Sequence, residues 1–541
     1  MLKKHLGIII VSTVAIFYRF WGLTAAGLHH DAALNSMRAL GWFDFLVGVG
    51  QTTPLIWFGY IPWWANLSFH DHPPLSFLIQ KIFFTIFGDS DFAALLPFAL
   101  AGVLTVWLIY WVLGRLSDKR TALLGALLFA VSSFNIWSSR SGLLEALSTM
   151  FITASAAALL LFIYSPQKKF WYGWAVFVSL AGLVKYTSVF LLPAAMVFLL
   201  LFDRRMFVSR KFWGALLLML VLLSPAVVYN GFVFQARGHF DAALSSMVGM
   251  SPADYATLSY RSLNANIGAN LRGIFMTLAE NISVPLFAVY LLAAAAGLAR
   301  IARRDFDKVT IFLLLNIFFI ILMFSFSGGG ERFLPILIPF FTLLAAWQTK
   351  WLAAYFRSPH IKTAAAAVLI FVASVEALFA FNTSLRAEKN HFVELDEFLR
   401  AEALDLTLSR KRISSLTDDR MYLEFAGKEI IIFDERADWF SRVWYVDRYK
   451  YYYGAPFVYL SDLSDAVGER NIDIFSYFRA QGAAGFWLVL AEGSSVSRNI
   501  DPTYDQVTES LREDLRAKNI VPVRQIHGHG EELSFSIYHF Q

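Results

Sequence analysis

Apolar runs recur along the first 384 residues of this chain, and they constrain its fold more than any other feature. A helix needs about 20 mostly apolar residues to cross the roughly 30 Å hydrocarbon core of a bilayer. The chain of 541 residues is 57% hydrophobic and only 16% charged, unlike a soluble protein of this length. The sequence therefore predicts a polytopic α-helical membrane protein. The runs cover approximately residues 5–25, 92–114, 121–138, 146–166, 170–184, 186–202, 213–233, 281–299, 310–328, 333–349 and 363–382.

The segments between these runs alternate between two kinds of charge. The basic ones are Lys3-Lys4, Arg115 to Arg120, Lys168-Lys169, Arg204 to Lys211, Arg300 to Lys308 and Lys350 to Lys362. The others are mixed or acidic, and the positive-inside rule places them outside the cytoplasm. Residues 73–88 begin with two prolines and contain Lys81, so we expect an amphipathic interfacial helix there rather than a span. This gives about eleven spans in the inner (plasma) membrane, with the N-terminus inside and the C-terminus on the periplasmic or extracellular side.

Residues 385–541 have a different composition, with many charges and no apolar run of membrane length. Short apolar strands are expected at 429–433, 457–460, 485–490 and 533–537, with amphipathic helical stretches at 462–480 and 503–518. Alternating strands and helices predict a small soluble α/β sandwich. The predicted domains are thus a membrane domain, 1–384, and an extracytoplasmic α/β domain, 385–541.

Composition also excludes some classes of function. Cysteine is absent, so disulfides and thiolate chemistry are excluded. The formal net charge of +5 is modest and comes mostly from short loops, so nucleic acid is not an expected partner, whereas membrane lipids are. None of the glycine-rich motifs that bind nucleotide phosphates is present.

Asp31 follows the first apolar run, directly after His29 and His30. A carboxylate at the mouth of a membrane bundle can act as a general base on a substrate hydroxyl or amine. The alternative is an interfacial helix N-cap.

A second cluster, His70-Asp71-His72-Pro73-Pro74, precedes the predicted interfacial helix. Its imidazoles and carboxylate suit a phosphate or a divalent metal ion, and His70 and His239 are the candidate metal ligands. A solvated loop that caps the helix explains the same residues, because proline is ordinary in a first helical turn.

Further charged residues fall in the loops assigned to the outer side. Arg140 and Glu145 flank the start of one span, where a local ion pair is the alternative to a shared site. Lys185 stands alone between two adjoining runs and suits a lipid phosphate, although snorkelling also explains it. Arg332 follows the glycines 328–330 and can bind a phosphate in a bidentate manner. Arg237 and His239 are weaker candidates of the same type.

Several of these segments together resemble the dolichyl-phosphate-mannose protein mannosyltransferase superfamily, and within it the bacterial branch that contains the aminoarabinose transferase of lipid A modification. The resemblance covers about residues 8–350. Its most specific part is the block from His72-Pro73-Pro74 to Phe87-Gly88, and it includes Asp31, Arg140 to Glu145, Gly182 to Lys185, and Arg332 to Pro339. The sequence departs from the family pattern at Ala32, where an acidic residue usually follows the aspartate, and in the glycine-rich context of Arg332.

The resemblance implies a GT-C fold and an inverting glycosyltransferase that takes its sugar from a polyprenyl-phosphate donor on the outer leaflet. By this resemblance Asp31 is the expected catalytic base and Glu145 a second active-site carboxylate. Lys185 and Arg332 are expected to bind the phosphate, and His72, Arg140 and Arg237 are further substrate-binding candidates. The acceptor is a lipid, a protein or a cell-envelope glycan. The rival hypothesis is a transporter or flippase of lipid-linked sugars, which would carry ionisable residues near the midpoints of its spans. In this chain we expect the spans to be free of charge and the charges to lie in the outer loops.

Overall fold

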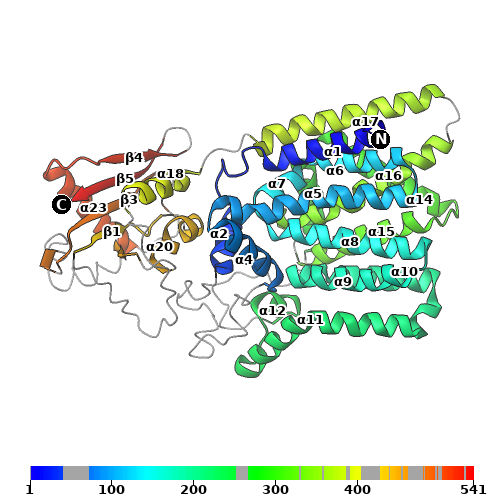
Figure 1. The fold of residues 1–541 in the computed structure, drawn as a ribbon, viewed down its shortest axis with the longest axis horizontal. Coiled ribbons are helices and arrows are strands. Elements are labelled where there is room, and N and C mark those ends of the chain that lie inside the picture. Colours follow the sequence, from blue (N-terminus) through cyan, green and yellow to red (C-terminus); the bar gives the residue numbers. More distant parts are fainter. Residues whose placement is uncertain are drawn as a thin grey trace. The chain divides into compact units, whose positions relative to one another are not determined.

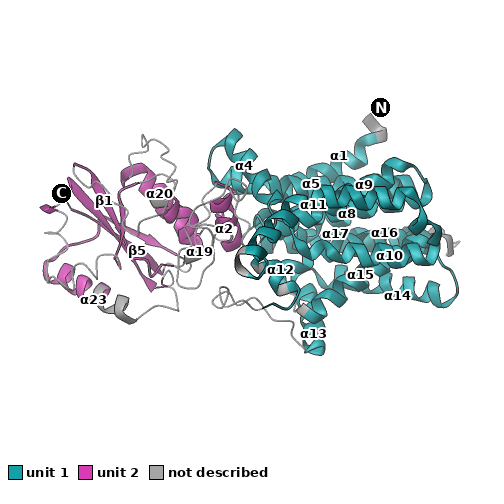
Figure 2. Ribbon diagram, turned by 90° about the horizontal axis from the view of Figure 1, so that it is seen from below, with its two compact units in different colours: residues 1–23, 47–53, 63–387 teal, residues 24–46, 54–62, 388–541 magenta. Residues whose placement is uncertain are grey.

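The computed structural model describes residues 2–40, 72–250, 266–327, 330–355 and 359–385, and in the C-terminal part 390–403, 427–437, 439–451, 455–460, 479–480, 482–493, 496, 502–528 and 532–540. These residues form two compact units (Figure 2), which are described separately. The first unit comprises residues 1–23, 47–53 and 63–387, and the second comprises residues 24–46, 54–62 and 388–541.

The described part of the first unit is helical (Figure 1). Its longer helices are α1 (Leu2–Phe20), α4 (Leu75–Phe87), α5 (Asp91–Leu116), α6 (Lys119–Val131), α7 (Ser133–Arg140), α8 (Leu144–Tyr164), α9 (Lys168–Val184), α10 (Leu191–Phe202), α11 (Arg210–Arg237), α13 (Ile267–Asn281), α14 (Val284–Ala302), α15 (Lys308–Ser327), α16 (Ile338–Tyr355) and α17 (Pro359–Ala380). Short turns are η2 (Tyr186–Phe190), η3 (Arg204–Val208), α12 (Ala242–Met247), η5 (Glu331–Leu337) and η6 (Phe381–Leu385).

Polar residues in the loops determine where several helices begin. The Ser90 side chain accepts a hydrogen bond from Ala93 N at the start of α5, and Asp118 accepts from Arg120 N and Thr121 N at the start of α6. Ser209 caps α11 in the same way. These oxygens satisfy backbone N–H groups that lack a partner in the first helical turn.

Each apolar run predicted to span the membrane is helical in the structure. Among the described residues, seven helices are long and apolar enough to cross a bilayer, and an eighth candidate is the pair α6 and α7, which bends by 56° at Ser132. The segments His5–Phe20, Leu75–Phe87 and Tyr186–Phe202 are shorter apolar helices. The chain is thus a multi-pass membrane protein, and the count of eleven spans stays a prediction. The predicted interfacial stretch 73–88 is the helix α4.

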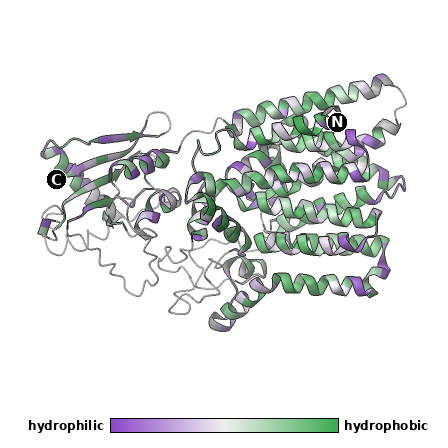
Figure 3. Ribbon diagram, in the orientation of Figure 1, coloured by the Kyte–Doolittle hydropathy of each residue, from purple (hydrophilic) through white to green (hydrophobic). Residues whose placement is uncertain are grey.

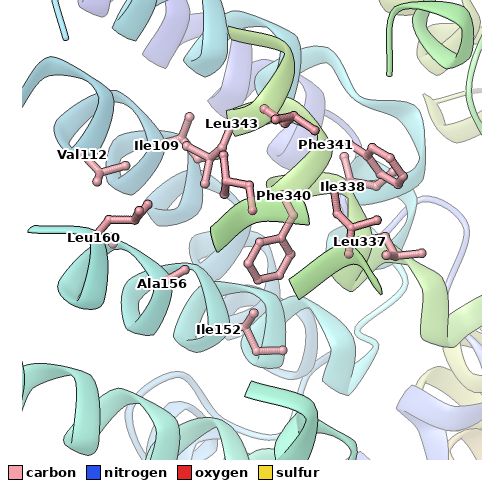
Figure 4. Close-up of a cluster of buried hydrophobic side chains, with 14 of the residues drawn as sticks. Ile109, Val112, Ile152, Ala156, Leu160, Leu337, Ile338, Phe340, Phe341 and Leu343 are labelled. Carbon is pink, nitrogen blue, oxygen red and sulfur yellow. The ribbon is translucent and has the colours of Figure 1, made fainter. Parts of the chain in front are cut away.

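The bundle has central and peripheral helices. The apolar windows of α8 and of η5 with α16 are 83% buried, whereas those of α11 and α17 are 22% buried. Figure 4 shows part of the core, where side chains of α5, α8 and α16 interdigitate, among them Ile109, Ile152 and Phe340. Hydrophobic residues cover the helices of this unit, and hydrophilic ones gather near helix ends (Figure 3). Glu145, one of the site residues described below, lies in the first turn of the well-buried helix α8.

The second unit contains a five-stranded sheet of strand order β2-β1-β3-β5-β4. The strands are β1 (Glu429–Phe433), β2 (Phe457–Tyr459), β3 (Gly485–Ala491), β4 (Arg524–His527) and β5 (Leu533–Phe540). β1 pairs in parallel with β2 and β3, and β5 runs antiparallel to β3 and β4. The four expected strands are present, and β4 is the strand that the sequence did not reveal.

Helices cover both faces of this sheet. Leu511 and Leu515 of α23 (Pro502–Ala517) pack on one face, together with Ile430, Ile432 and Leu488. On the other face Phe392 of α18 (His391–Phe398) lies 5.1 Å from Phe535 between ring centroids. This is the α/β sandwich that the sequence predicts. Its remaining described helices are α2 (His30–Ala39), η7 (Leu399–Ala403), α19 (Trp439–Arg442), η8 (Val443–Asp447) and α20 (Arg448–Tyr451).

Candidate functional site

Two of the predicted site residues meet in a buried ion pair. Glu145 lies in the first turn of α8 and Lys185 directly follows α9, and these helices pack side by side. Lys185 adopts an extended conformation (φ −158°, ψ 128°), which ends α9 before η2 begins. Its Nζ donates a hydrogen bond to Glu145 Oε1, and the two residues are 8% and 3% exposed. A buried charge pair costs desolvation energy and is therefore weak evidence for a purely stabilising role.

Phe333 brings Arg332 close to this ion pair. Lys185 Nζ lies 4.2 Å from the centroid of the Phe333 ring, and Arg332 Cζ lies 5.0 Å from the same centroid. Both residues of η5 follow the glycine segment, and the Arg332 side chain is exposed whereas Phe333 is half-buried. We call Glu145, Lys185, Arg332 and Phe333 the cation cluster. Two cations on one aromatic ring, with one carboxylate, form a site suited to a phosphate group.

A hydrogen-bonded network that the sequence did not reveal lies beside the cation cluster. Asp241 is fully buried, and its Oδ2 accepts hydrogen bonds from Tyr186 Oη and Asn230 Nδ2, both at 2.7 Å. Asp241 N in turn donates to Asn230 Oδ1 at 2.9 Å. Since Tyr186 directly follows Lys185, this network fixes the turn that carries the lysine. No local pattern marks these residues, because they come from three separate segments.

The two candidates near this network have different environments. His239 is 6% exposed, and its Nδ1 lies 2.7 Å from the carbonyl oxygen of Phe240, to which it donates when protonated. Arg237 is the last residue of α11, and its side chain lies outside the described part of the structure.

Arg140 does not form an ion pair with Glu145 and binds the end of α1 instead. Its guanidinium donates to the carbonyl oxygens of Trp21 at 2.7 Å, Gly22 at 2.8 Å and Tyr18 at 3.3 Å. The last carbonyls of a helix lack intrahelical partners, and a cation there also interacts favourably with the helix dipole. Arg140 thus anchors the point where the chain leaves α1, and its predicted role in substrate binding is untested.

Asp31 lies in the first turn of α2 and belongs to the second unit, whereas the cation cluster belongs to the first. The N-cap of α2 is His29, whose Nδ1 accepts a hydrogen bond from Asp31 N at 3.3 Å. The alternative of Asp31 as the N-cap is therefore wrong, since His29 has that role.

Of the two predicted metal ligands, His239 is among the described residues and His70 is not. His72 lies just before α4. Within the described ranges, no group of three or more His, Asp or Glu residues is arranged to hold a metal ion. A divalent metal at His70 and His239 stays a prediction.

Two charged residues inside the predicted spans also have defined partners. Glu376 in α17 accepts hydrogen bonds from Ser133 N and Ser283 N, each at 2.7 Å, and Arg19 in α1 donates to the Ala130 carbonyl at 3.0 Å. Both are fully buried. Their presence within the runs 363–382 and 5–25 was the signal in the sequence, and our expectation that these charges lie only in loops was wrong.

Comparisons with known proteins agree with the predicted resemblance and with this fold. Residues 71–229 match the family profile of the dolichyl-phosphate-mannose-protein mannosyltransferases. An uncharacterized protein of Aquifex aeolicus is 29% identical over 232 residues, 41% of this chain and 42% of that protein. The undecaprenyl phosphate-alpha-4-amino-4-deoxy-L-arabinose arabinosyl transferase 1 of Proteus mirabilis is 29% identical over 153 residues, 26% of each chain. The chain thus spans less than half the length of these curated relatives.

The solved structures extend the comparison to the whole chain. The crystal structure of ArnT from Cupriavidus metallidurans bound to undecaprenyl phosphate has a TM-score of 0.58 and 12% identity, and the match covers 98% of this chain and 97% of that one. The fold is therefore that of the GT-C class of membrane proteins. Residues 71–229 thus resemble the mannosyltransferase family, and the whole chain shares the fold of ArnT.

Proposed function

We propose that this chain is an inverting glycosyltransferase that moves a sugar from a polyprenyl-phosphate donor to an acceptor on the outer face of the membrane. The cation cluster carries this proposal, because Lys185 and Arg332 approach one aromatic ring at 4.2 and 5.0 Å and so present two positive charges to a phosphate. The related arabinosyl transferase of Proteus mirabilis and the ArnT structure supply the donor class by name, undecaprenyl phosphate. These relatives are transferases rather than transporters.

The proposed reaction needs a leaving-group site and a base. The bond between the anomeric carbon and the phosphate oxygen breaks, and the polyprenyl phosphate leaves as an anion. Lys185 and Arg332 stabilise the charge that develops on it, as preorganised cations do. Glu145 holds Lys185 in place before the donor binds.

Asp31 completes the reaction in this proposal. Its carboxylate takes the proton from the acceptor hydroxyl or amine as that atom attacks the anomeric carbon. A single displacement inverts the configuration at this carbon. The activated donor provides the driving force, so the residues need no nucleotide. His72 and Arg237 are proposed to contact donor or acceptor, and the sugar is a hexose or a pentose.

The chain topology supports a common side of the membrane for Asp31 and the α/β domain. Residues 24–40 follow α1, residues from 390 onward follow α17, and both segments belong to one compact unit. A compact unit lies on one side of a bilayer, so the chain crosses the membrane an even number of times between them. The apolar runs between residues 92 and 382 are even in number. The loop charges favour the periplasmic or extracellular side.

Replacing Asp31 tests the base. The Asp31→Asn variant is purified with wild-type protein, and sugar transfer from an undecaprenyl-phosphate donor is measured beside binding of undecaprenyl phosphate. Loss of a general base lowers turnover about 10²- to 10⁴-fold, and we expect phosphate binding to stay at the wild-type level. The control is Asp118→Asn, since asparagine also caps a helix. Wild-type turnover in Asp31→Asn would exclude this mechanism.

A further inference from the structure

The segment that carries Asp31 is tied to the C-terminal α/β domain by hydrogen bonds on both sides of Gly27. Leu28 N donates to the Tyr445 hydroxyl at 2.7 Å, and Asn390 N donates to the Ala26 carbonyl at 3.2 Å. Tyr445 lies in η8 and is fully buried. Two adjacent peptide units, only a few residues before Asp31, are therefore held by residues about 400 positions away in the chain.

Gly27 makes this close approach possible. It has a φ of +76°, a conformation that other residues rarely adopt. A Cβ atom at this position would lie 2.7 Å from both Tyr445 Oη and Val393 Cγ2. The backbone at Gly27 thus fits between two side chains of the α/β domain. A larger residue at position 27 would clash with them.

The helix that bears Asp31 continues the same attachment. α2 contacts both η8 and α19, and along it Ala32, Ala33 and Met37 are fully buried. His29 caps the helix by accepting from Asp31 N. Asp31 therefore stands at the start of a short helix whose entry point and buried face are both fixed by the C-terminal domain.

We propose that Tyr445 and Gly27 are positioning residues for Asp31. Through them the α/β domain holds the catalytic carboxylate in position. This rests on the proposed function, in which Asp31 is the base. A general base must lie within hydrogen-bond reach of the proton that it takes, and small displacements of a catalytic group lower the rate steeply. The domain then contributes to turnover through the position of Asp31.

The principal test is Tyr445→Phe, which removes one hydroxyl and keeps the ring. The matched control is Tyr459→Phe, because the Tyr459 hydroxyl also makes a buried hydrogen bond in this domain, to Asp447 at 2.7 Å, and does not bond residues 24–40 in any described contact. We expect kcat to fall about 10-fold in Tyr445→Phe, with KM for the donor within 2-fold of wild type, and no such change in Tyr459→Phe. Gly27→Ala should lower kcat further, because its Cβ would clash with Tyr445 and Val393.

Hydrogen exchange provides a second measurement that does not depend on activity. Peptides covering residues 24–40 should take up deuterium faster in Tyr445→Phe than in wild type or Tyr459→Phe, while peptides from α8 stay unchanged. Equal kcat and equal exchange in the two tyrosine variants would overturn the inference while an inactive Asp31→Asn leaves the proposed function in place. A fully active Asp31→Asn would overturn both.

Discussion

Two buried carboxylates in the membrane unit, Glu145 and Glu376, have opposite kinds of partner. Glu145 is 3% exposed and pairs with the side chain of Lys185, which also lies over the Phe333 ring. Glu376 is fully buried, and its described partners are backbone N–H groups and a hydroxyl: Ser133 N, Ser283 N and Ser133 Oγ, each at 2.7 Å. Glu145 binds a side-chain cation, and Glu376 binds the backbone.

The partners of Glu376 explain why a charge can stay inside a predicted span. α6 and α7 are a helix pair bent by 56°, and the break between them leaves N–H and C=O groups without intrahelical partners. Glu376 accepts from the first N–H of α7, while Arg19 donates to the Ala130 and Phe129 carbonyls at the end of α6, at 3.0 and 3.5 Å. Each charge therefore sits at the helix end whose dipole it complements.

The charges of Glu376 and Arg19 therefore have a structural role, whereas the Glu145–Lys185 pair suits a functional one. Backbone partners cannot be exchanged without unfolding the helix ends, so Glu376 and Arg19 stabilise the fold. A lysine side chain can turn from a carboxylate to a phosphate, so the Glu145–Lys185 pair can respond to a ligand. Four single substitutions test this difference, and they are ordered by their expected effect on stability.

The largest loss of stability is expected for Glu376→Ala. It leaves Ser133 N and Ser283 N without partners inside the bilayer, where each unsatisfied group costs several kcal/mol, so the free energy of unfolding should fall by about 5 kcal/mol. Denaturant unfolding in detergent micelles measures this. Ser374→Ala on the exposed side of α17 is the control, and an equal stability of the two variants would contradict a capping role.

Lys185→Met should cost about 3 kcal/mol, because it leaves the buried Glu145 without its cation. The double variant Glu145→Gln/Lys185→Met removes both charges and should unfold within about 1 kcal/mol of wild type, since replacing a whole buried pair is often neutral. The same unfolding experiment measures both. A double variant as unstable as Lys185→Met would show that the pair is needed for the fold.

Phe333→Leu should lower the stability by about 1 kcal/mol and weaken donor binding about 5-fold, because the ring that faces Lys185 and Arg332 is lost. Phe333→Tyr keeps the aromatic face and is the control. Binding of undecaprenyl phosphate and thermal unfolding measure the two effects. Equal binding by both variants would show that the aromatic ring does not contribute to phosphate binding.

Arg332→Ala should change stability by less than about 0.5 kcal/mol, since exposed charges contribute little to folding. Binding of the lipid phosphate should nevertheless weaken about 10-fold, and the loss should shrink as ionic strength rises and screens the charge. Titration of the lipid phosphate at low and at high salt measures this. Unchanged binding at low salt would show that Arg332 does not bind the phosphate.

The sequence predicted the fold well where the physics is local. Apolar runs and strand patterns report burial directly, and accordingly each predicted span is helical and β1, β2, β3 and β5 are strands. Glu145 and Lys185 were both predicted as site residues, but their ion pair was not, because it depends on the packing of α8 against α9. Arg140 was harder to interpret, because its carbonyl partners at the end of α1 carry no side-chain signature.

Contacts between distant segments could not be predicted in this way. Tyr445 and Leu28 meet through a backbone N–H and a tyrosine hydroxyl, which are not marked in the sequence. Glu376 was visible as a charge within a run, but its meaning required the break at Ser132, which is set by packing in three dimensions.

The cation cluster is tested most directly by the binding of undecaprenyl phosphate to the folded double variant Glu145→Gln/Lys185→Met, measured beside wild-type protein and Ser374→Ala. We expect wild-type affinity for Ser374→Ala and a loss of at least about 10-fold for the double variant, because a charge-assisted contact to the phosphate is gone. Wild-type affinity in the double variant would contradict the assignment of the cation cluster as the phosphate site.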